Sequence, residues 1–179
     1  MSALLLTPGA SATRNQPALV AIDDAATALG FTVERIDLPK RPAVKLIDVV
    51  RDAAEDLRTR DRTGPNQLFL GGRSLGGRVC SMAVADGLPA AGLVLVSYPL
   101  HPPGKPDKPR TEHLPRLDVP CLFVSGTRDS FGTPDELEAA TAAIPGPVTH
   151  VWVEGGDHGL RRKDAEVAEA VAAWLNDLR

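Results

Sequence analysis

The chain has 179 residues, a formal net charge of −3, and 43% hydrophobic and 24% charged residues. This length suits one domain that buries its own core, so we expect residues 1–179 to form a single domain without disulfides or metal. Because Lys and Arg form no basic stripe along the sequence, nucleic acid is excluded as an expected partner.

The chain opens with a short apolar run at residues 3–7, which predicts a strand. This run is too short for a signal peptide and has no basic residues before it, and no later run approaches the ~18 residues of a membrane span. The cysteines, Cys80 and Cys121, lie among apolar residues as free thiols do in a core. We therefore expect a cytoplasmic protein without a membrane partner.

Further along the chain, short apolar runs alternate with segments of helical periodicity, as in consecutive βαβ units. Strands are expected near residues 3–7, 31–36, 67–71, 92–97, 120–125 and 148–153. Helices are expected around residues 19–29 and 46–57, from residue 74 to about 87, from Thr133 to about Ala143, and over residues 167–178. The fold class is thus α/β, with about six parallel strands and helices on both faces.

The most informative motif is Gly-Arg-Ser-Leu-Gly at residues 72–76, a G-x-S-x-G sequence between a predicted strand and a helix. Such a turn strains the backbone and brings it close to its neighbours, so glycine is expected to be sterically required at Gly72 and Gly76. Ser74 is therefore the candidate nucleophile. No phosphate-binding loop motif overlaps this segment.

A serine nucleophile needs an imidazole to take its proton and a carboxylate to orient that imidazole. Asp129 and His158 follow the last two predicted strands, which gives the order Ser, Asp, His. Asp135 is a rival acid that is explained by its place in a helix first turn, and Asp157 is a weaker alternative. No metal-ligand motif is present, so neither metal nor cofactor is expected.

The oxyanion hole should use the backbone N–H of Leu75 and one from the loop at residues 7–11, where Ala10 is the best candidate. Arg73, Tyr98 and His101 are candidates for the rim of the pocket, and Arg73 there would favour an anionic acyl substrate. The remaining histidines, His113 and His150, are expected at the surface or the pocket rim.

These motifs resemble those of the α/β-hydrolase superfamily, and most nearly its small dienelactone-hydrolase-like proteins. Residues 71–78 and 97–106 resemble more narrowly a branch that includes relatives of a subunit of a chromatin acetyltransferase (non-specific lethal) complex. Dienelactone hydrolases proper carry a cysteine nucleophile, whereas this chain has Ser74, so dienelactone is not implied as substrate. The resemblance implies a minimal hydrolase fold that lacks the first two strands of the full sheet.

In that fold a helical cap often follows the strand that precedes residue 98. Here residues 98–119 contain six prolines, which favours an extended loop over a cap domain. We expect a serine esterase or thioesterase that cleaves a small acyl substrate through a catalytic triad and an acyl-enzyme. The alternative is a non-catalytic interaction module that retains the fold, which Pro8-Gly9 weakly favours because relatives commonly have His-Gly there. The sequence leaves the oligomeric state open.

Overall fold

One parallel sheet organises the computed structural model, which describes residues 2–178. Its strands are β1 (Ala3–Thr7), β2 (Thr32–Arg35), β3 (Leu68–Arg73), β4 (Gly92–Val96), β5 (Cys121–Gly126) and β6 (Val148–Val153). They lie in the order β2-β1-β3-β4-β5-β6, and every neighbouring pair is parallel. The predicted strands are confirmed in place and direction.

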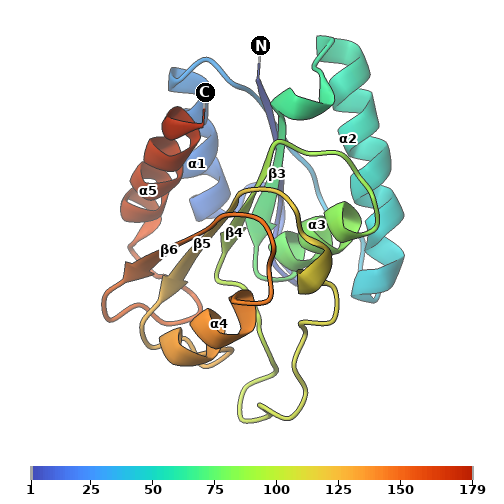
Figure 1. The fold of residues 1–179 in the computed structure, drawn as a ribbon. Coiled ribbons are helices and arrows are strands. Elements are labelled where there is room, and N and C mark those ends of the chain that lie inside the picture. Colours follow the sequence, from blue (N-terminus) through green and yellow to red (C-terminus); the bar gives the residue numbers. More distant parts are fainter. Residues whose placement is uncertain (1, 179) are drawn as a thin grey trace.

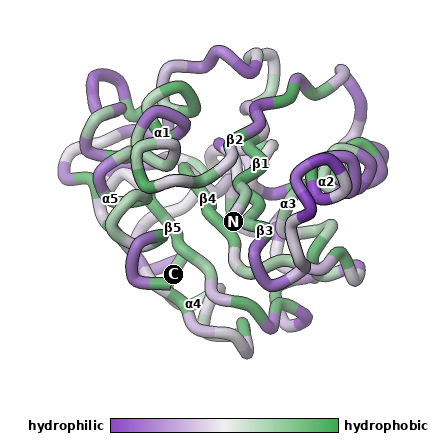
Figure 2. The backbone as a smooth tube through the Cα atoms, turned by 90° about the horizontal axis from the view of Figure 1, so that it is seen from above, coloured by the Kyte–Doolittle hydropathy of each residue, from purple (hydrophilic) through white to green (hydrophobic). Residues whose placement is uncertain are grey.

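Residues 2–178 form five α-helices: α1 (Pro17–Ala28), α2 (Ile47–Asp61), α3 (Leu75–Ala85), α4 (Pro134–Thr141) and α5 (Asp164–Asp177). Helices α1 and α5 pack on one face, and α2 and α3 cover the other (Figure 1 and Figure 2). Within residues 2–178, none of these helices has the length and apolarity that crossing a membrane would require.

The alternation of side chains along each strand explains the two-faced core. In β1, Leu4 and Leu6 belong to the apolar cluster under α1 and α5, whereas Leu5 belongs to the cluster under α2 and α3. All three leucines are fully buried. A strand with apolar residues on both faces must be covered on both sides, so the continuous apolar runs favour a parallel sheet between two layers of helices.

Local sequence signals set the ends of several helices. Before α4, the Thr133 hydroxyl accepts a hydrogen bond from the Glu136 N–H, and the Glu136 carboxylate accepts one from the Thr133 N–H. This is the predicted capping box. After α1, Gly30 takes a φ of 87°, a left-handed conformation that glycine adopts without strain.

The proline-rich segment after β4 forms an irregular loop that contains one short 3-10 helix, η3 (Leu114–Arg116), and no α-helix. Figure 1 shows it extending beyond the carboxyl end of the sheet, opposite the N-terminus. Its base is closed by a hydrogen bond of 2.7 Å from the Arg110 N–H to the Leu100 carbonyl. The expectation of a fold without a cap is confirmed.

The strand order also fixes where a site can form. From β1 the chain crosses to β2 on one side and returns to β3 on the other, so the loops after β1 and β3 diverge. This topological switch point leaves a crevice at the carboxyl ends of the strands, where parallel sheets bind ligands. Ser74 follows β3 and Ala10 follows β1 at this crevice.

His113 corrects an expectation, because it lies in the interior rather than at the surface or the pocket rim. Its Nε2 lies 2.8 Å from the Ser81 hydroxyl, and the residue is only 7% exposed. Leu114 and Leu117, which follow it, are buried in the core and draw the histidine inward. Burial, together with the nearby charges of Arg78 and Arg116, lowers the pKa of His113 to about 4.

This depressed pKa predicts acid sensitivity. Between pH 6.5, an ordinary histidine pKa, and pH 4, the unfolded chain binds a proton at His113 that the folded protein excludes, so the free energy of unfolding falls as pH falls. Across this window we expect the free energy of unfolding of the parent to fall by about 1–3 kcal/mol more than that of His113→Gln. Urea unfolding of both proteins at several pH values measures the difference, and parallel pH profiles would contradict it.

Candidate active site

The turn between β3 and α3 holds Ser74 in a strained backbone conformation, with φ 50° and ψ −115°. A side chain at Gly76 would place its Cβ 2.5 Å from the Thr7 carbonyl oxygen, and one at Gly72 would overlap Thr7. The two glycines therefore let β1 approach the turn closely, as predicted from the motif. The Ser74 N–H donates to the Val96 carbonyl at 2.8 Å, which ties the turn to β4.

Three side chains from three separate loops form a hydrogen-bonded chain at this turn. The Ser74 Oγ lies 2.9 Å from His158 Nε2, and His158 Nδ1 lies 2.9 Å from Asp129 Oδ2 and 3.0 Å from Oδ1. A carboxylate only accepts, so Nδ1 carries the proton and Nε2 of the neutral imidazole accepts from the serine hydroxyl. The structure thus brings together the residues predicted as nucleophile, base and orienting acid.

Neighbouring groups hold the acid and the imidazole in place. The Asp129 side chain is 2% exposed, and its Oδ1 also accepts from the Phe131 N–H at 2.8 Å. The Phe131 ring stacks on the His158 imidazole, with centroids 3.8 Å apart. A buried carboxylate with fixed partners and a stacked ring leave His158 little freedom to rotate.

The two rival acids have other roles. Asp157 accepts a hydrogen bond from the Leu160 N–H at 3.0 Å, which shapes the loop that carries His158. Asp135 lies in the first turn of α4, where a carboxylate favours the positive end of the helix dipole. Asp129 is the acid that reaches His158.

Arg73 lies beside the serine and also supports the histidine. Its Nη2 donates to the His158 carbonyl, which links the end of β3 to the loop after β6. Burial lowers the pKa of Arg73, while the charges of Asp129 and Asp157 act in the opposite direction. Arg73 is therefore a positioning residue for the His158 loop as well as part of the cavity wall.

A cavity of about 330 Å³ opens over the serine. It is lined by Ala10, Arg73, Ser74, Leu75, Arg78, Pro99, Arg110, Phe131 and His158. A second hollow of about 530 Å³, lined mainly by residues 9–13 and 38–42, shares Ala10 and Leu75 with it. The backbone N–H groups of Ala10 and Leu75 donate to no other residue within 2–178, so both are free to bind an oxyanion.

Two candidates for the pocket rim lie outside the cavity lining. The Tyr98 ring packs against Phe123, and its hydroxyl donates to the Arg110 carbonyl at 2.8 Å. His101 is turned toward α4, with Nε2 3.4 Å from the Glu136 carboxylate. Both residues are buried by the base of the proline-rich loop, which corrects the expectation that they border the pocket.

Other lining residues were not expected from the sequence. Arg78 follows Ser74 by four residues, which places both on one side of α3, so helical spacing could have found it. Pro99, Arg110 and Phe131 come from irregular segments, where no periodicity indicates the direction of a side chain.

The cysteines and acidic residues do not offer a competing site. Burial raises the pKa of Cys80 and that of Cys121 to about 12, which keeps both thiols protonated and unreactive. Within residues 2–178, no three His, Cys, Asp or Glu side chains gather in a way that could hold a metal ion.

Comparison with solved structures shows the same fold in several proteins. Est1E from Butyrivibrio proteoclasticus has a TM-score of 0.84 at 14% identity, covering 99% of this chain and 88% of that one. A putative α/β-superfamily hydrolase from Xanthomonas campestris has a TM-score of 0.76 at 21% identity, covering 99% of both chains. Dienelactone hydrolase from Anabaena variabilis has a TM-score of 0.78 at 18% identity, covering 99% of this chain and 86% of its own.

A family model gives the assignment that these identities are too low to provide. The model described as an alpha/beta hydrolase domain matches residues 1–176. The match spans all six strands and includes the three hydrogen-bonded residues Ser74, Asp129 and His158. The chain therefore belongs to the α/β hydrolase domain family.

Proposed function

We propose that this hydrolase is a serine esterase or thioesterase that cleaves a small acyl substrate through an acyl-enzyme intermediate. The observation that carries the proposal is the pair of hydrogen bonds that link Ser74, His158 and Asp129 beside an open cavity. The two free, buried cysteines suit a reducing compartment, and we place the protein in the cytoplasm.

The geometry supports a two-step reaction. Ser74 Oγ attacks the acyl carbonyl while His158 Nε2 takes the hydroxyl proton, and the imidazolium then gives that proton to the departing alcohol or thiol. Water attacks the acyl-Ser74 ester in the second step, again losing its proton to His158, which returns it to Ser74 as the acid leaves. Asp129 accepts the Nδ1 hydrogen bond throughout and stabilises the imidazolium.

The developing oxyanion needs donors that are fixed before the reaction begins. The N–H groups of Leu75 and Ala10 would provide them, because both residues line the cavity with Ser74. Leu75 is also the first residue of α3, so the helix dipole favours negative charge there. A single such donor commonly contributes about 100-fold or more to turnover.

A non-catalytic interaction module explains these features less well. The backbone at Ser74 is held in a conformation that costs about 1–3 kcal/mol, and a partner-binding surface elsewhere on the fold gains nothing from that strain. The strain is useful where it exposes the hydroxyl to His158 at the switch point.

Acyl-chain length provides a test of the proposed substrate class. We expect the highest kcat/KM for acetyl to about butyryl esters, because each buried methylene adds roughly 0.8 kcal/mol only where apolar surface covers it. The loop at residues 98–119 builds no helical lid over the 330 Å³ cavity. Initial rates on 4-nitrophenyl esters from acetate to decanoate, below their critical micelle concentrations, measure the trend.

Two results would contradict the proposed preference for short acyl chains. A steady increase in kcat/KM up to decanoate would mean that the acyl chain enters the hollow along residues 38–42 and is covered there. In a separate assay above the solubility limit, a jump in rate when the ester forms an emulsion would indicate a lid that opens at an interface, which this loop does not provide.

A further inference from the structure

The cavity beside Ser74 is strongly basic. Three arginines, Arg73, Arg78 and Arg110, line it together with His158, and no Asp or Glu is among its lining residues. The chain as a whole carries a net charge of −3. The site is therefore basic although the chain as a whole is acidic.

Two of these arginines have no counterion. Within residues 2–178, no ion pair includes Arg78 or Arg110, and the buried Nε of Arg78 has no hydrogen-bond partner. Arg110 donates one long hydrogen bond of 3.4 Å, to the Pro99 carbonyl. Arg73 differs, because it is engaged with the His158 loop.

Asp48, Asp86 and Glu112 line a neighbouring hollow together with Arg78, but none of them forms an ion pair with it within residues 2–178. On the side of the active site no lining residue balances the charge of Arg78. Burial and the charge of Arg78 both lower the pKa of Arg110, and they also lower the pKa of His113. Burial raises the pKa of Tyr98, so its hydroxyl stays neutral. Two positive charges that are half-buried side by side without an anion raise the free energy of the folded protein, and a bound anion would reduce that electrostatic cost.

Helix α3 and two backbone hydrogen bonds position the two arginines at the cavity. Arg78 lies on α3 four residues after Ser74, about 6 Å further along the helix axis. Arg110 closes the base of the proline-rich loop through its N–H to Leu100 and through its carbonyl, which accepts from the Tyr98 hydroxyl. The two cations are thus fixed within the same cavity as the nucleophile.

We propose that Arg78 and Arg110 bind a carboxylate of the substrate, so that this enzyme prefers short esters with a carboxylate a few bonds from the scissile carbonyl. The inference rests on the proposed function. The planar guanidinium fork matches a carboxylate, and charge-assisted hydrogen bonds to it are stronger than neutral ones. A cavity of about 330 Å³ has room for a small ester and its carboxylate together.

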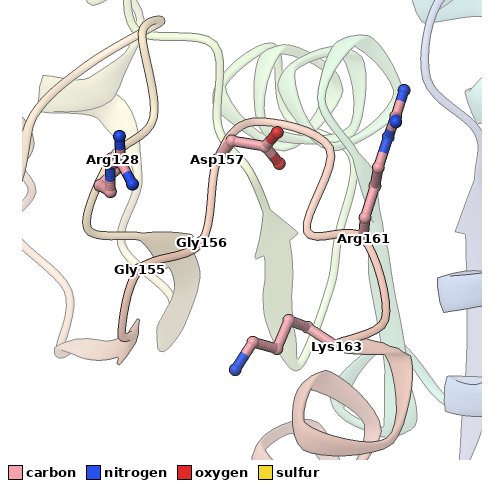
Figure 3. A pocket seen from close by; sticks show the side chains of 6 residues that line it. All are labelled: Arg128, Gly155, Gly156, Asp157, Arg161 and Lys163. Atoms are coloured by element: carbon pink, nitrogen blue, oxygen red, sulfur yellow. The ribbon is translucent and has the colours of Figure 1, made fainter.

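A second basic hollow in the molecule has an acidic residue in its lining and serves as an internal control. It has a volume of about 320 Å³ and is lined by Arg128, Gly155, Gly156, Asp157, Arg161 and Lys163. Figure 3 shows Arg161 and Lys163 extending in different directions around Asp157. Asp157 supplies negative charge there, and Lys163 pairs with Glu166 at 3.3 Å.

The test uses two pairs of esters that differ mainly in charge. Monomethyl succinate is compared with methyl levulinate, in which a methyl ketone replaces the carboxylate of the acyl group. Acetoxyacetate is compared with acetoxyacetone, which makes the same change on the alcohol side. We expect the anionic member of at least one pair to have a kcat/KM about tenfold higher or more, the effect of one charge-assisted hydrogen bond.

Substitutions then assign the preference to the two arginines. The anionic-to-neutral ratio should fall about tenfold in Arg78→Gln and in Arg110→Gln, and Arg78→Lys should restore part of it. Arg161→Gln removes the same charge from the control hollow of Figure 3 and should leave the parental ratio and activity. Equal kcat/KM values within both ester pairs, or the same fall in Arg161→Gln, would overturn the inference.

A binding measurement separates this inference from the proposed function. Calorimetric titration of the Ser74→Ala protein with all four esters should show about tenfold tighter binding of the anionic member in at least one pair, with no turnover to interfere. If the anionic esters bind tightly but the parent protein hydrolyses none of the esters, the carboxylate site is supported and the proposed esterase activity is contradicted. Equal binding of both members in both pairs would contradict the carboxylate site, whatever the activity.

Discussion

Ser74→Ala should fold like the parent and lose ester hydrolysis, with kcat lower by about 10⁴-fold or more. The alanine removes the Oγ that lies 2.9 Å from His158 Nε2 and leaves no other group at the turn that can form the acyl-enzyme. Steady-state rates on 4-nitrophenyl acetate measure the loss, and circular dichroism with thermal unfolding verifies the fold.

Ser97→Ala provides a matched control. Ser97 also has a positive φ, of 48°, and lies buried after the end of the neighbouring strand β4, but its Oγ contacts no hydrogen-bonding partner within residues 2–178. This variant should retain the parental kcat. Near-parental turnover by Ser74→Ala would mean that another group performs the reaction.

His158→Ala should lower kcat by about 10⁴-fold, because loss of the base leaves Ser74 with no acceptor for its proton. Asp129→Asn should also cost several orders of magnitude, roughly 10³–10⁴-fold, because the amide can donate to Nδ1 and favour the wrong tautomer. His101→Ala is the control, since that ring faces Glu136 away from the cavity, and it should change kcat only modestly. Single-turnover and steady-state rates on one activated ester compare the three variants. Near-parental turnover by His158→Ala would remove His158 from the mechanism.

Local patterns were sufficient to predict the sheet and the positions of the reacting groups. Continuous apolar runs such as that at Leu4 and Leu6 require cover on both faces of the sheet, so the sequence alone is sufficient to place the strands. The need for glycine at Gly72 and Gly76 could likewise be predicted from the motif, because a side chain at either position would overlap Thr7. Strand ends in a parallel sheet meet at one edge, which brought Asp129 and His158 toward Ser74.

Side-chain direction in irregular segments could not be predicted in the same way. Tyr98 and His101 follow a strand at the correct edge, yet the loop buries both against the core and α4. Arg110 reaches the cavity instead, because the loop folds back to bond Leu100. These outcomes depend on contacts between residues that no repeat or spacing relates.

Labelling by a fluorophosphonate probe tests the central claim most directly, because the probe reacts rapidly only with a serine whose hydroxyl is activated by a neighbouring base. The intact protein should gain one adduct, and peptide mapping should place it on Ser74, with none on Ser74→Ala and very slow labelling of His158→Ala. Modification at Ser97 or Ser125 in the parent, or no labelling of a demonstrably folded protein, would contradict the account.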